Sequence, residues 1–113
     1  MNDMLHPPFP IPDIPASNSD LADLFPEFVR SWIDEITAFV LSDAQRGNRE
    51  ELYRLGHTIK GSFMQFGLDA HALIGIQLMT FADRNDWPSA LAYLDALLQM
   101  LRSLQVQLDL PHL

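Results

Sequence analysis

Apolar residues recur at helical spacing in four stretches of this chain, and no stretch alternates apolar with polar residues as a half-buried strand would. On one stripe of the first stretch lie Phe28, Trp32, Ile36, Phe39 and Val40. The pattern predicts helices at about residues 26–46, 48–66, 69–84 and 86–108. Four helices of this length, joined by short loops, predict an all-α, up-down four-helix bundle.

Residues that favour helix ends mark these boundaries. Pro26 suits the first turn of a helix, where its missing N–H is not needed. Asn48 followed by Glu51 is typical of a capping box at the start of the second helix. Gly47 and Gly67 suit the C-terminal ends of the first two helices. The remaining boundary residues are Asp69, Asp86 with Pro88, and Pro111.

The chain begins with a proline-rich segment, PPFPIPDIP, at residues 7–15. Proline fixes φ and lacks the backbone donor, so we expect an extended arm over residues 1–18 and the bundle over residues 19–110. A short extra N-terminal helix is expected at 20–24. Two alternatives remain open for the arm. It is a mobile tail, or it lies across the folded domain through Phe9, Ile11 and Ile14.

Composition excludes several functional classes. A chain of 113 residues is one domain, and its net charge of −8 repels phosphate backbones, so we expect no binding to nucleic acid. There are no cysteines to form disulfides. The longest uncharged run, 70–82, is shorter than the roughly 20 residues that span a bilayer. We expect a cytoplasmic monomer that does not enter a membrane; a dimer contact through the third helix is the alternative.

The segment LGHTIKGSFMQFG, residues 55–67, places Gly56 and Gly61 on either side of His57 inside a predicted helix. Each interior glycine costs about 0.5–1 kcal/mol relative to alanine, so something must compensate. On a helical wheel His57 points away from the core face. Gly61, one turn later, would leave the ring accessible, whereas Gly56 would let a neighbouring helix approach closely. The core face carries Leu52, Leu55, Ile59, Phe63 and Phe66.

The outer patch around His57 predicts phosphoryl chemistry and docking. Imidazole offers a neutral nitrogen nucleophile near pH 7, and Lys60 lies on the same helical face to meet a phosphoryl group. Exposed Tyr53 and Met64, with Arg54 at the edge, indicate a partner-docking surface. The sequence has no P-loop and no kinase-type glycine-rich loop. A partner would therefore have to supply the metal and the catalytic groups.

The residues H-T-I-K-G-S at 57–62, with Gly67 ten positions after the histidine, resemble the motif of the histidine-containing phosphotransfer (HPt) domain family. The resemblance covers about residues 20–108. It implies a four-helix bundle that carries phosphoryl groups between receiver-domain aspartates in a phosphorelay. It also implies that His57 is phosphorylated, that Lys60 stabilises the phosphoryl group and that Gly61 permits the receiver's approach. Ser62 would be structural, and Gly67 would end the helix.

The resemblance implies partners rather than cofactors. Receiver domains of response regulators or hybrid sensor kinases would be the partners, and the receiver would supply Mg²⁺. The chain would then be a phosphoryl carrier without kinase activity of its own. The alternative is a non-catalytic helical bundle that docks and regulates a receiver or sensor kinase.

On the third helix the family pattern and this chain differ. The family more often has an apolar residue at the place of His71 and a polar residue at the place of Met79. Gln77 on the third helix and Gln65 on the second are two alternative polar neighbours for the His57 ring, and the sequence favours neither.

Overall fold

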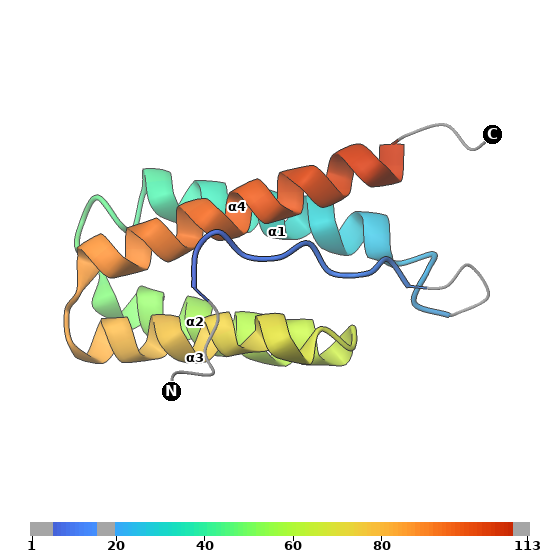
Figure 1. Ribbon diagram of the computed structural model, residues 1–113. Coiled ribbons are helices and arrows are strands. Elements are labelled where there is room, and N and C mark those ends of the chain that lie inside the picture. The colour runs from blue at the N-terminus through green and yellow to red at the C-terminus, as the bar shows by residue number, and fades with distance from the viewer. Residues whose placement is uncertain (1–5, 16–19, 110–113) are drawn as a thin grey trace.

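The computed structural model describes residues 6–15 and 20–109, and within them the only regular elements are four helices. The helices run side by side along the molecule, and the chain reverses direction at each loop (Figure 1). The prediction of an all-α chain of four helices is confirmed. The helices are α1 (Phe25–Leu41), α2 (Arg49–Gln65), α3 (Asp69–Asp83) and α4 (Trp87–Asp109).

The first helix is shorter than predicted. It ends at Leu41 rather than near Arg46, and residues 42–47 continue as turns. At Ser42 the backbone leaves the helical range, with a φ of −123° and a ψ of −77°, and the Ser42 N–H donates to the carbonyl of Phe39 at 3.2 Å. Gly47 has a φ of +64° and ends this turn segment, not α1 itself.

The predicted short N-terminal helix is wrong. Residues 20–24 form turns, in which the N–H of Leu24 donates to the carbonyl of Leu21 at 3.1 Å. Five residues make little more than one turn, and helix formation gains stability only when further turns follow the costly first one. Pro26 lies at the start of α1 as expected.

The core lies between the two helix pairs, α1 with α4 and α2 with α3, which are joined through contacts of α3 with α4. Aromatic rings fill the end near the start of α1: Phe28 lies 5.1 Å from Phe63 and 4.2 Å from Phe66, centroid to centroid. The largest side chains that are completely buried are Phe25, Phe63, Ile36, Leu52, Ile59, Ile74, Leu78, Leu94, Leu97, Leu101, Leu104 and Val29.

The described part of the proline-rich arm, residues 6–15, lies across α3 and α4, which matches one of the two alternatives. Phe9 is buried, and its ring centroid lies 5.4 Å from that of Tyr93 on α4. Ile11 and Ile14, in contrast, remain exposed. Figure 1 shows this segment in blue between α3 and α4. Residues 1–5 and 16–18 of the predicted arm lie outside the described residues.

In the described ranges, none of the helices combines the length and the apolar character that a membrane crossing requires.

Candidate functional site

His57 lies in the middle of α2, on the side opposite the buried stripe of that helix. Its side chain is exposed. The buried stripe consists of Leu52, Leu55, Ile59 and Phe63. Helical periodicity therefore explains why the ring points to solvent, as the sequence predicts.

The two glycines that flank His57 have different structural reasons. A Cβ with ideal geometry on Gly56 would lie 2.6 Å from the carbonyl oxygen of Gly75 and 3.0 Å from the nitrogen of Met79, both on α3. Gly56 thus permits a close helix crossing. Around Gly61, no heavy atom of the described residues comes within 4 Å of the corresponding position, apart from its chain neighbours and the adjacent backbone of α2. The volume beside His57 is therefore open, and internal packing does not require a glycine there.

Gly75 on α3 is a site-supporting residue that the sequence analysis missed. A Cβ at this position would lie 2.6 Å from the nitrogen and 3.0 Å from the Cβ of Lys60. The absence of a side chain at Gly75 therefore sets how closely α3 approaches the backbone that carries Lys60. The signal was available in the sequence, because Gly75 is an interior helix glycine with no turn to explain it.

Lys60 is partly buried, one turn after His57 on the same helix. Within residues 6–15 and 20–109, neither the His57 ring nor the Lys60 ammonium group makes an ion pair or a side-chain hydrogen bond. Both groups are consequently available to an external ligand. A compact ammonium charge on a flexible stem suits an incoming phosphoryl group.

The predicted docking residues lie around this pair. Tyr53 is 45% exposed and Met64 is 51% exposed, which leaves both side chains free for a partner. Arg54 is exposed as well, and its guanidinium lies 3.5 Å from the carboxylate of Glu51. An exposed ion pair of this kind contributes little to stability, so a partner can replace it at small cost.

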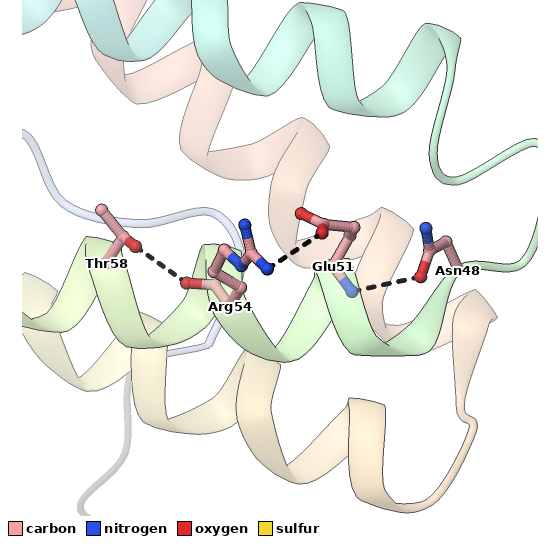
Figure 2. Close-up of polar contacts among 4 residues, drawn as sticks. All are labelled: Asn48, Glu51, Arg54 and Thr58. Carbon is pink, nitrogen blue, oxygen red and sulfur yellow. Dashed lines mark hydrogen bonds and ion pairs between the residues drawn. The ribbon is translucent and has the colours of Figure 1, made fainter.

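Figure 2 shows how this part of α2 is held. The side chain of Asn48 accepts a hydrogen bond from the N–H of Glu51 at 3.3 Å and caps the helix. The hydroxyl of Thr58 donates to the carbonyl of Arg54 at 2.9 Å. The Asn48 cap therefore stabilises the first turn of α2, and the Thr58 hydroxyl, next to His57, bonds to its own helix.

An open cavity of about 510 Å³ lies between α1 and α2, and sequence analysis did not predict it. Arg54 and Thr58, which flank His57 in the sequence, form part of its wall. Glu35 and Glu51 give the wall carboxylates from both helices. The cavity thus extends from the predicted docking residue Arg54 toward α1.

Ser62 and Gly67 have contacts inside the bundle. The indole N–H of Trp32 donates to the hydroxyl of Ser62 at 3.0 Å, and this bond ties α1 to α2. Gly67 has a φ of +74°, and the N–H of the next residue, Leu68, donates to the carbonyl of Phe63 at 2.9 Å. This is the Schellman geometry that ends many helices and favours glycine.

The two candidate polar neighbours of His57, Gln77 on α3 and Gln65 on α2, differ in burial. Gln77 is buried, whereas Gln65 is exposed at the end of α2. No hydrogen bond joins either of them to the His57 ring among the described residues. Met79 lies at the crossing, because its backbone nitrogen is next to Gly56. His71 is buried and contacts the arm instead of the His57 patch.

Comparison with known proteins identifies the family. A family model described as Hpt domain matches residues 20–106, which is most of the chain. Comparison with curated proteins and with solved structures gives no match. The matched residues include all of α1, α2 and α3, and with them the exposed histidine and its lysine. The chain therefore belongs to the Hpt domain family.

Proposed function

We propose that this chain is a phosphoryl carrier. His57 accepts the phosphoryl group from the aspartate of one receiver domain and passes it to the aspartate of another. Membership of the Hpt family implies a phosphotransfer role in a phosphorelay. The observation that carries the assignment to His57 is its geometry. The ring is exposed in the middle of α2, Lys60 follows one turn later, and the space at Gly61 is open.

The proposed step is a nucleophilic displacement at phosphorus. An unprotonated ring nitrogen of His57 attacks the aspartyl phosphate, a P–N bond forms, and the P–O bond to the aspartate breaks. The electron pair of that bond returns to the receiver as a carboxylate. In the second transfer, the aspartate carboxylate of another receiver attacks phosphorus and displaces the imidazole. Phosphoryl is conserved throughout, and no nucleotide is needed.

Lys60 stabilises the transferred group electrostatically. The phosphoryl oxygens carry negative charge in the transition state, and a nearby ammonium group lowers its energy. Lys60 makes no ion pair within the part of the chain that the structure describes, so no carboxylate has to be displaced first. Its backbone is packed against Gly75, which limits the positions that its side chain can reach.

The metal belongs to the receiver in this proposal. Across the described residues, no group of three or more histidine, cysteine, aspartate or glutamate side chains could hold a metal ion. The receiver would bring Mg²⁺ and its own catalytic groups to His57. We expect it to cover Tyr53, Arg54 and Met64 as it docks. The role places the chain in the cytoplasm, as a monomer that associates with receivers transiently.

A panel of phosphorylated receiver domains tests the proposal. The receivers carry labelled phosphoryl groups, Mg²⁺ is present, and transfer to the wild-type chain is compared with transfer to His57→Gln. We expect label on the wild type only, at a rate that differs between receivers. Binding of receivers without any label on the chain would favour the alternative, a bundle that docks and regulates its partner without accepting phosphate.

A further inference from the structure

The arm contacts α3 and α4 through one ring and one carbonyl. The ring of Phe9 packs edge-to-face on Tyr93, 5.4 Å between centroids, and Tyr93 packs edge-to-face on Phe81 at 4.9 Å. Next to it, the Nε2 of His71 donates to the carbonyl of Pro10 at 2.6 Å. Phe9 is only 6% exposed, and His71 is also 6% exposed. Tyr93 on α4 and His71 on α3 therefore contact two consecutive residues of the arm, and Phe81 supports the Tyr93 ring.

These contacts share two features with proline-rich peptide recognition, an aromatic surface and a donor to a backbone carbonyl, and the ring that packs on the surface is that of Phe9. A polyproline segment has no internal hydrogen bonds, so its carbonyls are available to a donor on another element. Proline-rich segments typically dock on aromatic surfaces and lose little conformational freedom on binding, because their backbone is already extended. In this chain the Tyr93 ring, which packs on Phe81, supplies the aromatic surface, and His71 supplies the donor.

Beyond Pro10 the arm continues along the surface of the bundle. Residues 12–15 lie beside residues 66–71, at the start of α3, and together they line a shallow cavity of about 350 Å³. The arm thus runs antiparallel to α3, from the Phe81–Tyr93 pair toward the end of α2. Exposed Ile11 lies between the two contact regions and does not contribute an anchor.

We propose that His71, Phe81 and Tyr93 form a binding site for a proline-rich segment, which residues 6–15 of the same chain occupy. This site is separate from the phosphoryl-accepting face of α2 and does not depend on the proposed function. Because the contacts are noncovalent and local, the site should also accept the segment when it is supplied as a separate peptide. The arm of the same chain then competes with the added peptide, and its effective concentration at the site is high.

The test uses the full chain and a labelled peptide of residues 6–15. In Phe9→Asp a charge replaces the buried ring, so the cis arm should leave the site. In the matched control, Ile11→Asp, the same change is made at an exposed position of the arm. We expect saturable peptide binding to Phe9→Asp, and binding about tenfold or more weaker to the wild type and to Ile11→Asp, whose own arms compete. Equal binding to all three proteins, or none to a folded Phe9→Asp, would overturn the proposal.

Two further measurements separate the site from nonspecific adhesion. Adding Tyr93→Ala to Phe9→Asp should weaken peptide binding about tenfold, as expected for loss of an aromatic anchor. A peptide with its prolines replaced by alanine should also bind about tenfold more weakly, because it must lose more conformational freedom. Undiminished binding of that peptide would contradict recognition of proline-rich segments.

A measurement on the unmodified protein covers the case in which Phe9→Asp loses helix content. Nuclear Overhauser contacts between the Phe9 and Tyr93 rings should be present in the wild-type protein. Their absence from a folded wild-type protein would contradict the proposed occupancy of the site.

Discussion

Gly56 on α2 and Gly75 on α3 let the two helices cross with their backbones in contact. A Cβ on Gly56 would lie 2.6 Å from the carbonyl oxygen of Gly75, and a Cβ on Gly75 would lie 2.6 Å from the nitrogen of Lys60. The crossing therefore involves the residue that precedes His57 and the backbone of Lys60, and His57 and Lys60 are the two residues that define the proposed phosphoryl site. The helix that presents the reactive face is held from behind by a contact that only glycine permits.

Alanine substitutions should separate the roles of the two glycines beside His57. Gly56→Ala should destabilise the fold by about 1–3 kcal/mol, because the added methyl group collides with α3 backbone. Gly61→Ala, the matched control on the same helix, should stabilise it by about 0.5–1 kcal/mol, because alanine is the better helix former and the space is open. Urea unfolding of both variants measures the difference. Equal effects of the two substitutions would show that the crossing is not as tight as described.

A larger side chain at Gly61 should affect transfer rather than folding. In Gly61→Leu the side chain projects into open volume, so the helix content and the midpoint of thermal unfolding should be retained. The leucine should nevertheless slow phosphoryl acceptance, because it occupies space that the receiver needs beside His57. Gln99→Leu, an exposed position on α4, serves as the control. Transfer to Gly61→Leu at the wild-type rate would contradict the access role of this glycine.

Removal of the Lys60 charge should slow phosphoryl acceptance with little effect on stability. A charge-assisted hydrogen bond contributes about 1.5–3 kcal/mol, so Lys60→Ala should lower the transfer rate by about one to two orders of magnitude. Single-turnover transfer from a phosphorylated receiver measures this. Arg102→Ala removes an exposed positive charge on α4 and controls for the change in net charge. An equal loss of rate in both variants would point to general electrostatics instead.

The cap of α4 should make stability depend on pH in the acid range. Hydrogen bonds from the side chain and the backbone N–H of Ser89 hold the pKa of Asp86 below its ordinary value. Because this pKa is lower in the folded than in the unfolded chain, the ionised carboxylate contributes its full stabilisation above the ordinary pKa of about 4. That contribution is lost as the pH falls through the folded-state pKa.

Asp86→Asn is the variant that measures this dependence, since asparagine also caps helices but does not titrate in this range. As the pH falls from about 5 to 2, the free energy of unfolding of the wild type should decrease relative to that of Asp86→Asn. Asp83→Asn, at the exposed end of α3, is the control. If the stability difference from the wild type depended on pH equally for Asp86→Asn and for Asp83→Asn, the result would argue against the capping contact.

Local signals predicted most of this fold because the apolar periodicity marks the four helices and several boundaries carry residues that favour helix ends. The side chain of Asn48 caps the start of α2, Gly67 ends the helix with a positive φ, and the apolar stripes face the core. The end of α1 was misplaced because the sequence offers Gly47 as the helix end, whereas the hydrogen bonds of the turns at residues 42–47 are visible only in three dimensions. Boundaries are where a one-dimensional pattern carries least information.

The candidate site was predictable where it depends on one helix and not where it depends on two. The spacing of His57 and Lys60 on α2 follows from helical geometry alone. Gly75 lies 18 positions after His57 in the sequence, and its relation to Lys60 depends on how α2 and α3 cross. The cavity beside Arg54 likewise needs the placement of α1, which the sequence pattern does not provide.

If His57 carries the phosphoryl group, mapping the modified residue on the chain should locate the phosphate on its ring. The wild type, His57→Gln and the matched control His6→Gln are incubated with a phosphorylated receiver and Mg²⁺, and the modified residue is identified by mass spectrometry under alkaline conditions. We predict an acid-labile, alkali-stable modification on His57 in the wild type and in His6→Gln, and none in a folded His57→Gln. Phosphate on another residue, or undiminished labelling of His57→Gln, would contradict the account.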